Sequence, residues 1–104
     1  MTVLSLNETN FESSVKSGVV LIDFWAEWCG PCQQMLPLLD QFAEKIGDKV
    51  TVAKVNVDEA QNIAQQYRVM SIPTLIVLKD WEMVDQMVGV QSVEKLEEVC
   101  GKYL

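Results

Sequence analysis

The sequence predicts an α/β domain in which a central mixed sheet of about five strands is flanked by four helices, in the order β-α-β-α-β-α-β-β-α. Three observations support this class. Residues 19–26 are apolar on both alternating faces except at Asp23, as in a strand covered on both sides. Residues 31–47 follow the three-and-four spacing of an amphipathic helix. Two short β-like runs, 74–78 and 83–88, are close enough to form an antiparallel hairpin.

Shorter patterns predict the elements of the first half. Residues 3–6 form a strand candidate, and Asn7 can cap a helix that Gly18 ends. Residues 50–57 alternate and are rich in β-branched side chains, which favours a strand. Apolar residues at helical spacing predict a short helix over 60–67.

Individual residues mark the ends and interruptions of the longer helices. Gly47 ends the helix that starts after the cysteine pair. Pro37 falls inside that helix, where it removes a backbone donor and should produce a kink. Ser92 can cap a last helix, whose apolar stripe includes Cys100.

Length and charge restrict the classes of protein. The 104 residues are 49% hydrophobic, which predicts a single domain over residues 1–104. Acidic residues outnumber basic ones by 15 to 8, so binding to nucleic acid or to anionic lipid is disfavoured. No apolar run approaches the ~20 residues of a membrane span. The first residues lack a basic leader and a long apolar core, so we expect a cytoplasmic protein.

The sequence contains no histidine. This excludes Ser-His-Asp and Cys-His nucleophilic sites and removes the commonest zinc ligand. In a reducing cytosol, paired cysteines are more often catalytic than structural. Any cysteine chemistry here must therefore use a thiolate that is stabilised by other means.

The run Trp28-Cys29-Gly30-Pro31-Cys32 lies between the buried strand and the long helix. Unpaired N–H groups at a helix start favour the thiolate form of Cys29. Gly30 tolerates an unusual backbone and close approach, and Pro31 suits a first helical turn. The more buried Cys32 can then resolve a mixed disulfide formed at Cys29.

Two other interpretations of the cysteine pair stay open at this point. A structural disulfide is one, although closing so small a ring stabilises by only about 2 kcal/mol. Half of a zinc site is the other, although zinc takes about four ligands and no second pair of this spacing exists. We therefore expect a redox-active disulfide and no metal.

Two segments resemble the thioredoxin family: residues 24–32 resemble its active-site segment, and residues 71–74 its cis-proline loop. The resemblance covers essentially the whole chain. It implies the thioredoxin fold and a protein-disulfide reductase that carries electrons and binds no cofactor.

The same resemblance implies the roles of individual residues. Cys29 matches the nucleophile and Cys32 the resolving thiol. Asp23 matches a buried acid beneath the pair, whose pKa burial should raise, and which can accept a proton from Cys32. Lys54 matches the lysine that faces this acid; its alternative is an ordinary solvated strand lysine.

The expected substrate groove has a similar basis. Pro73 matches the cis proline, which would turn the Ile72 backbone toward an extended substrate. Gly89 matches a groove-lining glycine and Trp28 an indole beside the motif. Their alternatives are an ordinary strand-start proline, a strand-to-helix turn and core packing. The full groove set is Trp28, Gly30, Pro31, Ile72, Pro73 and Gly89.

Three residues stand apart from this set. Asp80 and Trp81 replace a glycine-containing turn of the family, and Trp81 is expected to be exposed. Cys100 is expected to be a small buried apolar residue, with an oxidisable thiol as the alternative.

The predicted function is reduction of disulfides in client proteins. The resemblance implies re-reduction by a thioredoxin reductase and clients such as ribonucleotide reductase, peroxiredoxins and methionine sulfoxide reductases. We expect a monomer. The alternatives are an oxidase or isomerase on the same fold, and a binding module in which the redox pair is incidental.

Overall fold

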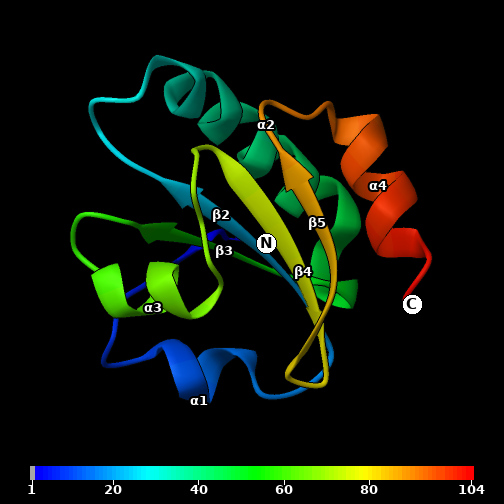
Figure 1. Cartoon of the computed structure of the whole chain (residues 1–104). Coiled ribbons are helices and arrows are strands. Elements are labelled where there is room, and N and C mark those ends of the chain that lie inside the picture. The colour runs from blue at the N-terminus through cyan, green and yellow to red at the C-terminus, as the bar shows by residue number, and fades with distance from the viewer. Residues whose placement is uncertain (1) are drawn as a thin grey trace.

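Five strands form the central sheet in the order β1-β3-β2-β4-β5 (Figure 1). The computed structural model describes residues 2–104. β3 is parallel to β1 and β2, whereas β4 is antiparallel to both β2 and β5, so the predicted mixed sheet is confirmed. The strands are β1 (Leu4–Leu6), β2 (Val19–Trp25), β3 (Thr51–Asn56), β4 (Thr74–Lys79) and β5 (Glu82–Val88).

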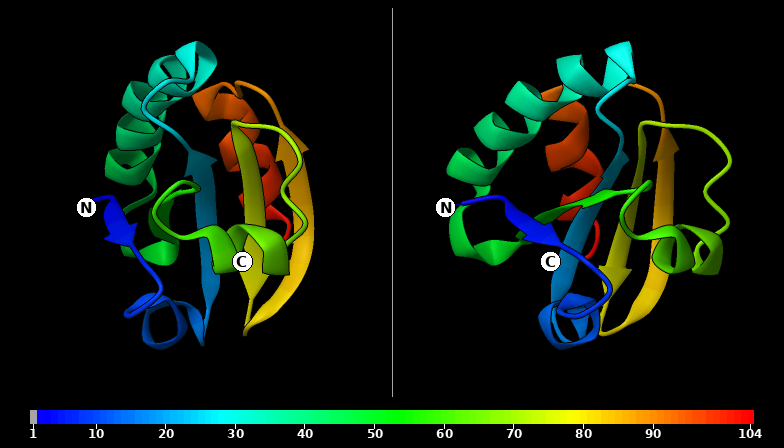
Figure 2. Two further views of the ribbon diagram at one scale, coloured as in Figure 1. Left: turned by 60° about the vertical axis from the view of Figure 1, so that its left-hand side comes forward. Right: turned by 90° about the vertical axis from the view of Figure 1, so that its left-hand side faces the viewer.

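Helices cover both faces of the sheet. α2 and α4 lie together on one face, and α1 and α3 lie on the other (Figure 2). A short 3-10 turn, Gly47–Lys49, follows α2. The helices are α1 (Phe11–Val15), α2 (Gly30–Ile46), α3 (Gln61–Gln66) and α4 (Val93–Gly101).

The central strand β2 is buried on both faces, as its sequence predicts. Val19 and Leu21 belong to the core beneath α2 and α4, whereas Val20, Ile22 and Phe24 belong to the core beneath α1 and α3. Because side chains alternate along a strand, Asp23 shares the face of Val19 and Leu21. A carboxylate is therefore placed on the side of the sheet that α2 covers.

Two local signals around α1 misled the sequence prediction. Asn7 does not cap α1: its Oδ1 accepts the N–H groups of Thr9 and Asn10 at 2.9 and 3.1 Å, which forms a turn, and α1 begins only at Phe11. Gly18 does not end the helix either, because α1 stops at Val15. Gly18 instead has a φ of +76° and pairs with the distant β4–β5 turn.

That β4–β5 turn is shorter than predicted, because both strands extend until only Asp80 and Trp81 separate them. Both residues have left-handed φ angles, +48° and +79°, which suit the two-residue turns of hairpins. Asp80 Oδ1 accepts the Gly18 N–H at 2.9 Å, and the Asp80 N–H donates to the Gly18 carbonyl. The Trp81 ring packs 6.5 Å from Phe11, and Trp81 is partly exposed, as predicted.

This pairing predicts that Asp80→Ala lowers the free energy of unfolding by about 1–2 kcal/mol, because it removes a hydrogen bond and because Ala tolerates the left-handed region less well than Asp. Asp80→Asn is the matched control, since Asn tolerates this backbone and keeps the acceptor oxygen. Urea unfolding at neutral pH measures both variants. Equal stabilities for the Ala and Asn variants would contradict the role of the side chain.

Candidate functional site

Cys29 and Cys32 are joined as a disulfide at the start of α2. Cys29 is the N-cap residue of the helix, and the Cys32 N–H donates to Cys29 Sγ at 3.2 Å. Pro31 lies in the first turn, as predicted. The sulfur of Cys29 therefore occupies the position at which helices usually carry a capping oxygen, and the helix start stabilises negative charge there.

The two cysteine residues differ slightly in the fraction that is exposed to solvent. Cys32 is fully buried, whereas 5% of Cys29 remains exposed. Both belong to a small cluster with Ala26, against which Val57 and Ile72 pack. Of the pair, only Cys29 keeps a small exposed fraction that another molecule can reach.

The loop before β4 closes over the disulfide. The Ile72 carbonyl oxygen lies 3.7 Å from Cys29 Sγ, and the Ile72–Pro73 peptide bond is cis, as expected. The Gly89 N–H donates to the Pro73 carbonyl at 2.8 Å, and Gly89 has a φ of +90°. The structure thus brings together Cys29, Ile72, Pro73 and Gly89, as the sequence analysis expects.

Trp28 borders an open apolar groove beside the disulfide. Its side chain is 71% exposed, and its Nε1 donates to Asp58 Oδ2 at 2.8 Å. Asp58 was missed from the sequence, because a hydrogen bond across 30 positions leaves no local signal. The groove has a volume of about 340 Å³ and is lined by Trp28, Val57, Ala64, Val69, Met70, Ser71 and Ile72.

Asp23 is fully buried, and neither of its carboxylate oxygens has a hydrogen-bond partner within residues 2–104. Burial raises the pKa of Asp23 to about 7, and the positive charge of Lys54 opposes part of that rise. Lys54 is the cross-strand neighbour of Asp23 in β3, and its Nζ lies 5.5 Å from the Trp25 ring centre. The charge pair expected from the sequence is therefore in register, and Trp25 packs against it.

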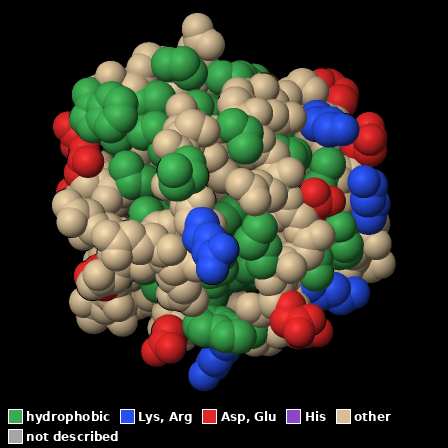
Figure 3. Space-filling model, viewed as in Figure 1, with side chains coloured by type: hydrophobic (Ala, Val, Ile, Leu, Met, Phe, Trp, Pro, Cys, Tyr) green, Lys and Arg blue, Asp and Glu red, His purple; other side chains and the backbone are tan. Residues whose placement is uncertain are grey.

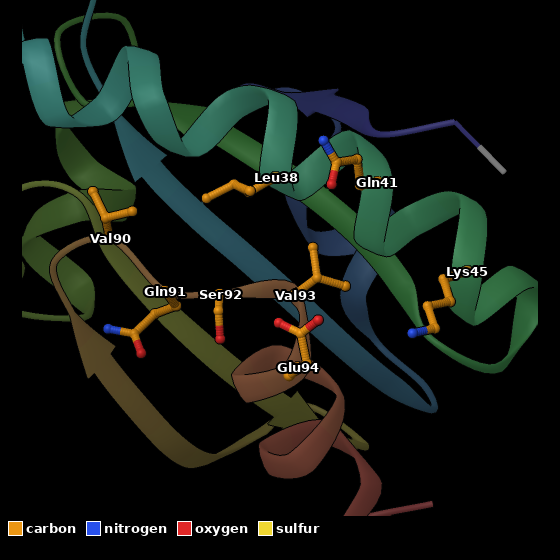
Figure 4. A pocket seen from close by; sticks show the side chains of 8 residues that line it. All are labelled: Leu38, Gln41, Lys45, Val90, Gln91, Ser92, Val93 and Glu94. Carbon is orange, nitrogen blue, oxygen red and sulfur yellow. The ribbon is translucent and has the colours of Figure 1, made fainter.

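A larger cavity lies elsewhere, between α2 and the start of α4 (Figure 4). It has a volume of about 490 Å³, and neither Cys29 nor Cys32 lines it. Its connection to the site runs through Gln91, whose Nε2 donates to the Gly89 carbonyl at 3.2 Å. Because no cysteine lines it, the cavity takes no direct part in disulfide exchange.

The third cysteine, Cys100, forms no disulfide and is buried. Cys100 is fully buried in α4, and burial, reinforced by the charge of Asp85, raises the pKa of its thiol to about 12. The expectation of a small buried apolar residue is confirmed.

The described part of the chain, residues 2–104, holds no group of three or more His, Cys, Asp or Glu side chains that could bind a metal ion. None of its helices has the length and apolarity needed to cross a membrane.

Comparison with known proteins identifies the family. The sequence model of the thioredoxin family matches residues 2–102. The chain belongs to the thioredoxin family. It is 45% identical to the thioredoxin of Bacillus subtilis (strain 168) and 47% identical to that of Staphylococcus epidermidis (strain ATCC 12228), over 104 residues and all of each chain.

A solved structure supports the same assignment. A mutant thioredoxin from Halobacterium salinarum NRC-1 is 37% identical, with a TM-score of 0.88 over 96% of this chain and 88% of that one. The chain thus has the thioredoxin fold and is a thiol–disulfide oxidoreductase with protein-disulfide reductase activity. Thioredoxin family membership implies disulfide-containing substrates and a thioredoxin reductase as its kinds of partner.

Burial of Asp23 predicts how the stability of this thioredoxin changes with pH. With a pKa of about 7 when folded and about 3.8 when unfolded, the folded state binds more protons between these values. The free energy of unfolding should therefore fall by about 4 kcal/mol as pH rises through this window and level off above it.

The measurement is urea unfolding of the oxidised protein from pH 4 to 8.5, beside Asp23→Asn. The difference between the two proteins isolates Asp23 from every other titrating group. A difference that stays constant over this range would show that Asp23 does not titrate as described.

Proposed function

We propose that this thioredoxin reduces disulfides in client proteins through Cys29 and Cys32. The observation that carries the proposal is a disulfide at the N-terminus of α2 in which Cys29 keeps 5% exposure and Cys32 is fully buried. The groove beside Trp28 supports the proposal, because a client chain needs a place to lie while its sulfur meets Cys29.

The exchange runs in two steps from the reduced protein. The Cys29 thiolate attacks one client sulfur, the client S–S bond breaks, and the other client sulfur leaves as a thiolate and takes a proton. Cys32 then loses its proton and attacks Cys29 Sγ, which frees the first client sulfur. Two electrons pass to the client and the Cys29–Cys32 bond forms; of the two protons that the client thiols take up, one derives from Cys32 and the other from solvent.

Asp23 accepts the proton of Cys32 in the second step. Lys54 lowers the pKa of Asp23 and so increases the fraction of the ionised acid that can accept this proton. Support comes from the pKa of about 7, which suits a base working near neutral pH, and from its position on the strand face beneath α2. The register with Lys54 places a positive charge next to the ionised acid.

The remaining site residues position the client. The Ile72 backbone pairs with an extended client segment beside Cys29, and Pro73 and Gly89 shape that edge. Trp28 covers the apolar part of the client chain. Gly30 and Pro31 keep the two cysteines within reach and leave room for the approach.

The wider setting completes the proposal. Residues 1–104 act as one domain and as a cytoplasmic monomer, with no bound cofactor and no role at nucleic acid or membranes. A thioredoxin reductase resets the disulfide. Client classes are ribonucleotide reductase, peroxiredoxins and methionine sulfoxide reductases.

The cysteine assignment predicts the outcome of insulin reduction with dithiothreitol as the electron source. Cys29→Ser should lower the rate to the background of dithiothreitol alone, because it removes the attacking sulfur. Cys32→Ser should instead accumulate a mixed disulfide with the client, detected by mass spectrometry. A wild-type rate in Cys29→Ser would refute the reductase chemistry, and client binding by an inactive wild type would favour the binding module.

The role of Asp23 predicts a second kinetic result. In single-turnover experiments, Asp23→Asn should leave mixed-disulfide formation unchanged and slow its resolution by about 10²-fold. In the wild type the resolution rate should rise with pH and level off above about 7, because only ionised Asp23 can accept a proton. Asp23→Asn should lack that inflection, whereas a purely structural role would leave it in place.

A further inference from the structure

We infer that the groove selects clients by charge and prefers segments that carry Lys or Arg beside their reactive cysteine. The inference rests on the proposed function and adds a substrate class to it. The groove's occupant is an extended apolar segment with basic flanking residues, whose charge complements the acidic side chains around the disulfide.

Four segments of the chain frame the disulfide and its groove: 26–34, 56–60, 69–75 and 87–92. The Trp28–Asp58 hydrogen bond joins the first to the second. The contact of Ile72 with Cys29 and the Gly89–Pro73 hydrogen bond join the other two. Any client sulfur that reaches Cys29 must therefore pass among the side chains of these segments.

None of the four segments contains a Lys or an Arg, although the chain has 8 such residues. They do contain three exposed acids, Glu27, Asp58 and Glu59. In Figure 3, apolar side chains gather over the start of α2 and the loop leading into β4, with acidic side chains at the left margin and a basic side chain below them near the centre of the face. Trp28 and the 93% exposed Met70 are among the apolar residues of the chain that remain exposed.

The basic residues nearest in sequence to these four segments do not place a positive charge in the groove. Lys54 is half-buried, next to the Trp25 ring and opposite Asp23. Lys95 pairs with Glu98 at 3.6 Å. Arg68 precedes the groove residue Val69 and is not among the residues that line the groove. The residues that line the groove therefore include no cation that would offset the negative charge of the nearby acids when a client binds.

Gln33 is the residue at which this charge balance can be tested. It is exposed directly after Cys32, and its Nε2 donates to the Glu27 carbonyl at 3.2 Å. Its side chain therefore lies over the start of α2, and it contributes no charge. A lysine there would place a cation at the edge of the site without altering either cysteine.

The expected consequence is a difference in association rate. Complementary charge speeds encounter, like charge slows it, and salt screens both effects. Clients with basic flanks should reach Cys29 faster than clients with acidic flanks, and high ionic strength should remove most of the difference.

The test uses three peptide disulfides with the same apolar residues around the cysteine and two flanking Lys, Ser or Glu residues. Second-order rate constants are measured with the reduced protein at ionic strengths of about 0.05 and 0.5 M. Each constant is divided by the rate with dithiothreitol alone, which removes the intrinsic reactivity of the peptide. The variants are Gln33→Lys and, as matched control, Gln41→Lys, eight residues or about 12 Å further along α2.

For the wild type we expect a Lys-to-Glu rate ratio of about ten at low salt and below about three at high salt. Gln33→Lys should lower the low-salt ratio at least threefold, and Gln41→Lys should change it by less than half as much. A wild-type ratio near one, or equal effects of the two variants, overturns the inference. Reduction of none of the peptides refutes instead the proposed function.

Discussion

The position of the Cys29 sulfur as the cap of α2 is the constraint on which the site depends. A capping atom must accept N–H groups at the helix start, and Cys32 supplies one at 3.2 Å. The same N–H groups favour an anion at this sulfur when the disulfide is reduced. β2 fixes where this happens, because it is buried on both faces and leads directly to the start of α2. Fold and chemistry thus share one feature, the junction between a covered strand and a helix.

Asp23 shows what this arrangement costs. A carboxyl group with no hydrogen-bond partner among residues 2–104 is stable in the core mainly in its neutral form, and only Lys54 eases its ionisation. A hydrophobic side chain would suit the interior of β2 better. The buried acid therefore opposes stability at neutral pH, where a proton acceptor beneath the cysteines is of most use.

Periodic patterns predicted the parts of the fold that local sequence determines. β2, α2 and the β4–β5 hairpin follow from continuous apolar runs, helical spacing and short separation. Predictions at Asn7 and Gly18 were wrong because the Asn7 side chain forms a turn before α1 and the backbone of Gly18 pairs with Asp80, 62 residues away. Asp58 was missed because, as at Gly18, its partner is distant in the sequence. The kink expected at Pro37 and the individual roles of the site residues stay predictions.

The lack of histidine and the charge distribution together explain why backbone groups matter so much here. No lysine, arginine or histidine stands in the four segments that frame the disulfide, and their three acids disfavour a nearby anion. The peptide N–H groups of α2 are then the main source of positive potential at Cys29. Because these N–H groups act on the Cys29 sulfur itself, their effect is the same for every client. The acids attract or repel the charges that a client carries, so their effect differs from client to client. Reactivity and selectivity therefore come from different parts of the same site, one from the backbone and the other from the side chains.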